Sequence, residues 1–303
     1  KAGGDGGRGQ RRGVARRGGA MALPPPRDPS DGRRSGYEAL PTDGEPPPGG
    51  PGRHTPLFVP LTAAACIAAL VYELYDNGRS SQAGRGGDDE DCAYRVWLQG
   101  ALLCAASLAA NPLVGPPSDV LVRLGAKRNE SILEDGEVWR LVAPLFLHAG
   151  VVHLALNMAA LLQLGSRLEG DHGALRVGAV YLTSGIYGVV MSAVMSPHSV
   201  SVGASGAIFG LLGAHIGEVI LNWGLFDRPC LALCETLFVA SLQLLVGTTP
   251  MVDNFAHFFG FCMGLVCGMG VLASPQAARQ NLPLGGKCQK HMLQALASSA
   301  AYL

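Results

Sequence analysis

Residues 201–221 carry the sequence SVGASGAIFGLLGAHIGEVIL, an apolar run with one acidic side chain. A helix of about 20 residues crosses the ~30 Å hydrocarbon core of a bilayer, so this run predicts a membrane-spanning helix. A second such run, NFAHFFGFCMGLVCGMGVL, occupies residues 254–272. Ser205 lies a few residues inside the first run, and His257 lies a few residues inside the second. Because polar side chains are expensive in lipid, these two residues are candidates for a shared function.

Four more apolar runs of similar length precede or separate these two. Of the 303 residues, 48% are hydrophobic and only 15% are charged, and the charged residues of 141–272 cluster between the runs. A soluble helical bundle would show polar faces that these segments lack. We therefore predict an all-α polytopic membrane helix bundle with a six-transmembrane core, whose spans are 57–75, 142–164, 174–195, 201–221, 230–248 and 254–272.

The two ends of the chain lack this pattern. Residues 1–56 are rich in Gly, Pro and Arg and predict a disordered cytosolic tail before the membrane domain of 57–272. Because the first methionine is Met21, residues 1–20 are interpreted as an upstream extension, although their arginines also resemble a transit peptide in composition. Residues 273–303 predict a cytosolic linker and a truncated or divergent seventh helix that begins near His291.

A long loop at 76–141 follows the first span. Its apolar stretch 98–110 is too short to cross a bilayer, so we expect an amphipathic or interfacial helix there. The loop also contains Cys92 and Cys104, which are able to pair if the loop faces an oxidising compartment.

Charge in the short loops predicts the orientation. Lys and Arg are frequent before the first span and after the second, fourth and sixth, whereas loops 196–200 and 249–253 have none. Since cytosolic loops carry the excess of Lys and Arg, the second, fourth and sixth helices begin on the non-cytosolic side. His153, Ser205 and His257 lie near those three starts, and their predicted depth is roughly 5–15 Å.

Glycines at regular spacing allow two of these helices to pack closely against each other. Gly260, Gly264 and Gly268 repeat every four residues after His257, and glycines also recur along 206–217. Small residues at such spacing allow close backbone approach in lipid. We therefore expect the Ser205 hydroxyl to come within hydrogen-bond reach of His257.

Other interpretations of these residues are weaker. A soluble serine hydrolase is disfavoured because position 207 is Ala where its nucleophile turn has Gly. A channel or transporter would show inverted repeats or broken helices, which the sequence does not show. The cysteines and histidines have no zinc-ligand spacing, and His215 is interpreted as structural.

Over roughly residues 57–272 the chain resembles the rhomboid intramembrane serine proteases, most closely the plant secretase-type branch. The resemblance rests on several motifs in the family's order. They are NPLVGP at 111–116, WR at 139–140, FLHAGVVH at 146–153 with Asn157, SVGASGA at 201–207, and VDNFAH at 252–257 followed by Gly260 and Gly264.

The resemblance implies a serine endopeptidase with a Ser–His dyad and without cofactor, metal or nucleic acid. Ser205 would be the nucleophile and His257 the general base and acid. His153, Asn157 and the Ser205 backbone would hold the oxyanion. The implied partners are the bilayer and single-span membrane proteins, cut near the luminal or extracellular side, while the oligomeric state stays open. The alternative is a rhomboid-like pseudoprotease that binds membrane helices without cleaving them.

Neighbouring residues would support the site. Trp139 and Arg140 fit an interfacial anchor, in which the Arg140 guanidinium binds loop carbonyls. Asp253 is interpreted as a loop-end residue rather than a third catalytic member. Phe259 departs from many relatives, which have a small residue there, and would crowd the helix contact if it faced inward. The supporting glycines are Gly203, Gly206, Gly260 and Gly264. The expected location is a Golgi, endomembrane or plasma membrane, with the N-terminus cytosolic.

Overall fold

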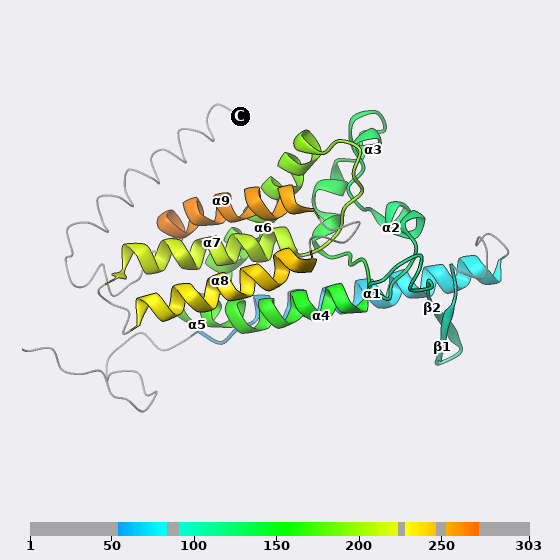
Figure 1. Ribbon diagram of the computed structural model, residues 1–303, viewed down its shortest axis with the longest axis horizontal. Coiled ribbons are helices and arrows are strands. Elements are labelled where there is room, and N and C mark those ends of the chain that lie inside the picture. The colour runs from blue at the N-terminus through cyan, green and yellow to red at the C-terminus, as the bar shows by residue number, and fades with distance from the viewer. Residues whose placement is uncertain (1–53, 84–90, 224–227, 247–252, 273–303) are drawn as a thin grey trace, which may run out of the picture. The chain divides into compact units, whose positions relative to one another are not determined.

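The computed structural model describes residues 54–83, 91–223, 228–246 and 253–272, and these form a helical bundle (Figure 1). The predicted tail of 1–56 and the predicted seventh helix near His291 lie almost wholly outside these ranges. Chain order gives α1 (Phe58–Gln82), β1 (Tyr94–Leu98), β2 (Ala101–Ala105), α2 (Ser118–Leu124), α3 (Asn129–Leu133), η1 (Val138–Leu141), η2 (Ala143–Leu145), α4 (Val151–Ala160), η3 (Leu161–Gly165), α5 (Ser166–His172), α6 (Ala174–Met195), α7 (Ser205–Leu221), α8 (Pro229–Val246) and α9 (Asn254–Val271).

The helical membrane bundle predicted from the sequence is confirmed. Among the described residues, four helices are long and apolar enough to cross a membrane: α1, the continuous helix Val151–His172, α6 and α9. That continuous helix contains α4 and α5, which the π-helical turn η3 joins. Shorter apolar helices at Ser205–Leu221 and Pro229–Leu242 lie where the fourth and fifth spans were predicted.

Several predicted helix boundaries are wrong. The first span continues to Gln82 rather than ending at residue 75. The second helix starts at Val151 rather than 142, because the chain around Pro144 forms the short 3₁₀ turns η1 and η2, and it continues to His172 rather than ending at 164. The fourth starts at Ser205 rather than 201, because Gly203 has a φ of +131°, which is incompatible with a right-handed helix.

The interfacial helix predicted at 98–110 is also wrong. The structure has an antiparallel hairpin there, with Leu98 opposite Ala101 and Tyr94 opposite Ala105. The two turn residues, Gln99 and Gly100, both have positive φ, which is the backbone of the tight hairpin turn.

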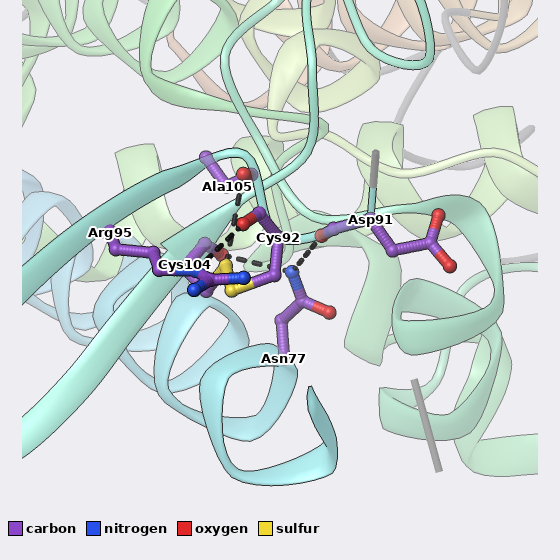
Figure 2. Close-up of a disulfide and its surroundings, with 6 residues drawn as sticks. All are labelled: Asn77, Asp91, Cys92, Arg95, Cys104 and Ala105. Atoms are coloured by element: carbon purple, nitrogen blue, oxygen red, sulfur yellow. Dashed lines mark hydrogen bonds between the residues drawn. A yellow bond between two sulfur atoms is a disulfide. The ribbon is translucent and has the colours of Figure 1, made fainter. Parts of the chain in front are cut away.

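A disulfide joins Cys92 to Cys104 at the base of this hairpin, so the pairing that the sequence left open does form. Figure 2 shows Asn77 of α1 beneath it. Its amide donates to the carbonyls of Asp91, at 2.8 Å, and Cys104, at 3.0 Å. The long loop is therefore fastened to the last turns of α1.

Glycines bring α7 and α9 into backbone contact. A Cβ added to Gly260 would collide with the carbonyl oxygen of Gly206, and one added to Gly264 would collide with that of Gly210. Gly268 packs in the same way against Ala214. The predicted close approach of these two helices is therefore confirmed, and it sets the position of the residues at their beginnings.

Candidate active site

Ser205 and His257 form a hydrogen bond at the beginnings of α7 and α9. The distance from Ser205 Oγ to His257 Nε2 is 2.6 Å, and the two residues are 4% and 1% exposed. The ring of Phe209, one turn along α7, stacks on the His257 ring with centroids 4.5 Å apart. The hydroxyl and the imidazole are thus held in the arrangement that an activated serine nucleophile requires.

No third member completes a triad within the described part of the chain. His257 Nδ1 is buried without a hydrogen-bond partner there. Asp253, the nearest acidic residue in the sequence, instead caps α9, and its carboxylate accepts from the backbone N–H groups of Phe255 and Ala256. The expected loop-end position of Asp253 is confirmed.

His153 and Asn157 lie one turn apart on α4, and His153 lies beside Ser205 across Gly203. His153 Nδ1 accepts a hydrogen bond from the Ala149 N–H at 3.4 Å, which assigns the ring proton to Nε2. That Nε2 and both amide atoms of Asn157 are buried and have no partner among the described residues. Since buried polar atoms are normally paired, these donors are available to a group that enters the site.

Gly203 leaves room between Ser205 and His153 that a larger residue would fill. A Cβ at this position would lie 2.7 Å from His153 Cε1 and 3.4 Å from Ser205 Oγ. A small cavity of about 10 Å³, bordered by Gly203, Ser205, Gly206 and Asp253 among others, adjoins the hydroxyl. This volume approaches that of one water molecule.

The predicted pair before α4 has its expected contacts. Arg140 is buried and donates from Nη1 to the carbonyls of Val122, at 2.7 Å, and Ala126, at 3.0 Å. Its guanidinium also lies 4.8 Å from the ring of Trp139, which is 46% exposed. The guanidinium binds loop carbonyls as predicted, and these contacts hold the loop that contains α2 and α3.

His148 supports the site without touching the dyad. Its ring packs against His153 with centroids 5.4 Å apart, and its backbone N–H donates to Glu73 of α1 at 3.0 Å. Burial lowers the pKa of His148 to about 4, so the ring is neutral near pH 7. Sequence reasoning missed two buried charged residues, Glu73 and Lys127, because neither belongs to a recognisable motif.

Phe259 does not crowd the dyad. Its ring packs edge-to-face on Tyr187 of α6, with centroids 6.4 Å apart, and on Phe258, with centroids 5.2 Å apart. The α7 contact is instead made by Gly260. His215 faces Glu218 at 3.6 Å, more than two turns along α7 from Ser205. Within the described ranges, no group of three or more His, Cys, Asp or Glu residues is arranged to hold a metal ion.

Comparison with known proteins places this chain in a family. Residues 135–274 match the family model described as the rhomboid domain. RHOMBOID-like protein 5 of Arabidopsis thaliana is 37% identical over 243 residues, which are 77% of this chain and 76% of that protein. RHOMBOID-like protein 6, mitochondrial, of the same plant is 35% identical over 224 residues, 74% of this chain and 71% of that protein.

Two other relatives bear on activity. Rhomboid-type serine protease 2 of Emericella nidulans is 35% identical over 147 residues, 48% of this chain and 29% of that protein. Inactive RHOMBOID-like protein 8 of Arabidopsis thaliana is 32% identical over 170 residues, 56% of this chain and 48% of that protein. The bundle, the paired Ser205 and His257, and these matches together show that the chain belongs to the rhomboid family of membrane proteins.

Proposed function

We propose that this protein is an intramembrane serine endopeptidase that cleaves single-span membrane proteins. The observation that carries the proposal is the 2.6 Å hydrogen bond between Ser205 Oγ and His257 Nε2, both buried at the beginnings of apolar helices. A buried serine–imidazole pair suits acyl transfer, and a relative named as a serine protease supports this class of reaction.

In the first step, Ser205 Oγ attacks the scissile carbonyl while His257 Nε2 accepts its proton. The resulting oxyanion would be held by the Ser205 N–H and by the free donors of His153 and Asn157. Ser205 is the first residue of α7, where a helix leaves its N–H groups unpaired and carries partial positive charge. Each donor of this kind typically contributes about 10²–10³ in rate.

The tetrahedral intermediate then collapses, and His257 gives its proton to the leaving amine. Water deprotonated by His257 next attacks the acyl-enzyme, so that the carboxylic acid leaves and Ser205 regains its proton. The extended backbone of the substrate must find hydrogen-bond partners in the protein, because lipid supplies none. Helices that unwind readily near the cleaved end are the expected substrates.

We also propose that the N-terminus is cytosolic and that cleavage occurs near the opposite, luminal or extracellular face, in a Golgi, endomembrane or plasma membrane. The bias of Lys and Arg toward one set of loops supports this orientation. One relative is named as mitochondrial. Fractionation of cells that express the tagged full chain therefore tests the compartment.

Cleavage of a fluorescent single-span reporter in liposomes tests the activity. The wild type should cleave it, whereas Ser205→Ala and His257→Ala should not. Ser241→Ala and His198→Ala are matched controls, because both residues are exposed and lie outside the site. Equal cleavage by all five proteins would refute the dyad. Binding of the reporter by the wild type without cleavage would instead identify a pseudoprotease.

A further inference from the structure

Lys127 places a fully buried ammonium close to the dyad, in the loop between α2 and α3. The side chain has 0% exposure. Its Nζ donates to Ser192 Oγ at 2.9 Å, to the Ser196 carbonyl at 2.9 Å and to Ser199 Oγ at 2.7 Å. Nζ also lies 3.7 Å from Asp253 Oδ2. These groups come from the end of α6, the loop that follows it, and the beginning of α9.

The backbone of Lys127 holds the segment that leads into the nucleophile. Its N–H donates to the Ser201 carbonyl at 3.0 Å, so the two residues form an isolated antiparallel bridge. Two residues further on, the Gly203 N–H donates to the Pro144 carbonyl at 2.8 Å. The chain is thus fixed at two points just before α7 begins at Ser205.

The side chain of Lys127 holds the helix that carries the base. Asp253 Oδ1 accepts from Phe255 N, at 3.0 Å, and Ala256 N, at 3.2 Å, while the Asp253 carbonyl accepts from the N–H of His257 at 3.1 Å. The other carboxylate oxygen contacts the Ser192 hydroxyl and faces the ammonium. Asp253 is therefore fixed from both sides, with His257 one turn away.

We propose that Lys127 is a positioning residue for the dyad, which fixes Ser205 through its backbone and His257 through the ion pair with Asp253. Its hydrogen bonds and ion pair run to Ser192, Ser196, Ser199, Ser201 and Asp253 rather than to the Ser205 hydroxyl or the His257 ring. The inference rests on the proposed function only in so far as the dyad is used for catalysis. A buried charge is costly without a counter-charge, so loss of either charged side chain should loosen the beginning of α9, whereas the backbone bridge to Ser201 remains.

The protonation state of Lys127 makes this role testable through the pH dependence of kcat. Burial lowers the pKa of Lys127 from its ordinary value of 10.5, and the neighbouring Asp253 carboxylate opposes that shift. Asp253 is the charged group that faces the ammonium from α9, and the groups contributed by α6 and its loop are hydroxyls and a carbonyl. The dyad should therefore lose its alignment at alkaline pH, when the ammonium becomes neutral.

Hydrogen exchange and kinetics on four variants of the full chain test the proposal. Lys127→Met removes the charge at nearly constant volume, and Asp253→Asn removes the opposite charge but keeps a capping side chain. The third variant combines both changes. Arg128→Met is the matched control, because the adjacent Arg128 pairs with Glu130 at an exposed site. Exchange is measured at the amides of 253–257, and the rates are measured with the single-span reporter.

Lys127→Met should speed amide exchange at 253–257 by about tenfold and lower kcat by about tenfold, with KM unchanged. The double variant should recover part of the protection from exchange and part of the lost kcat. Asp253→Asn should move the alkaline loss of kcat to lower pH, an effect that a purely structural role would not produce. Unchanged exchange in Lys127→Met, or effects that simply multiply in the double variant, would overturn the proposal. If even the wild type fails to cleave, the proposed function fails, and exchange alone still decides the positioning role.

Discussion

Replacing Gly260 by alanine tests whether backbone contact between α7 and α9 makes the dyad. The added Cβ would lie 3.0 Å from the carbonyl carbon of Gly206 and closer still to its oxygen. Carbon atoms in contact prefer about 3.5–4.0 Å, so the helices must separate by on the order of 1 Å. Gly206 follows Ser205 directly and Gly260 is three residues from His257, so the separation acts at the level of this hydrogen-bonded pair.

That separation is large compared with the tolerance of the hydrogen bond. Lengthening the 2.6 Å contact between Ser205 and His257 by on the order of 1 Å gives about 3.6 Å, beyond hydrogen-bond range. General-base assistance typically contributes about 10²–10⁴ in rate, so we expect kcat/KM to fall at least about 100-fold. Overpacking a tight interface should also destabilise the fold by about 1–3 kcal/mol.

Reporter cleavage in liposomes measures the first effect, and thermal unfolding in detergent measures the second. Gly217→Ala is the matched control, because its added Cβ meets Leu265 O at 3.1 Å on the same interface, more than three turns from Ser205. We expect at most a few-fold change in kcat/KM for this control. Wild-type activity in Gly260→Ala, with the control equally active, would refute the view that glycine packing sets the dyad geometry.

Three further predictions concern the oxyanion donors, the buried imidazole and the disulfide. Asn157→Ala and His153→Ala should each lower kcat by about 10²–10³ with little change in KM, as steady-state kinetics will measure, because their free donors act on the transition state. The pKa of His148 is lowered to about 4 from 6.5, so the unfolded chain binds a proton in this range that the folded chain does not. Stability should therefore fall by up to ~3 kcal/mol as the pH drops from 6.5 to 4, and unfolding curves of His148→Gln should lack this slope. Replacing Cys92 and Cys104 by serine should destabilise the protein by about 3 kcal/mol in thermal unfolding, and equal melting temperatures in the variant and the oxidised wild type would contradict this.

The sequence predicted the membrane helices because lipid leaves few alternatives. A spanning segment must satisfy its own backbone, so a run of about 20 apolar residues indicates a helix. The same reasoning predicted the α7–α9 contact, since small residues at every fourth position of one helix need a partner backbone. The structure pairs Gly260 with Gly206 and Gly264 with Gly210.

Local patterns failed where tertiary contacts decide the structure. The stretch 98–110 is rich in Ala and Leu, which favour helix, yet it begins inside a hairpin that the Cys92–Cys104 disulfide and Asn77 hold. Leu102 packs so closely on α1 that a Cβ on Gly78 would collide with its carbonyl. The tight turn at 99–100 lacks the Asn-Gly or Asp-Gly pair that usually marks it, so composition alone favoured the helix.

The contacts of Lys127 were beyond sequence reasoning for a related reason. The residue lies in the long region between α1 and α4, and its partner Asp253 is more than 120 positions away. Neither periodicity nor motif spacing connects two such positions. The dyad was predictable because both members lie on helices whose starts were constrained by lipid, whereas a loop residue acquires its partners only when the whole fold forms.

The corrected start of α7 changes what the helix contributes to the proposed chemistry. A serine four residues inside a helix would donate its backbone N–H to the carbonyl one turn earlier, and that N–H would be unavailable to an oxyanion. The positive φ of Gly203 ends the extended segment just before the helix and makes Ser205 its first residue. Its N–H then belongs to the unpaired, partially positive end of α7, beside the free donors of His153 and Asn157. Gly203 therefore matters through its backbone conformation as well as through the space that it leaves beside His153 and Ser205.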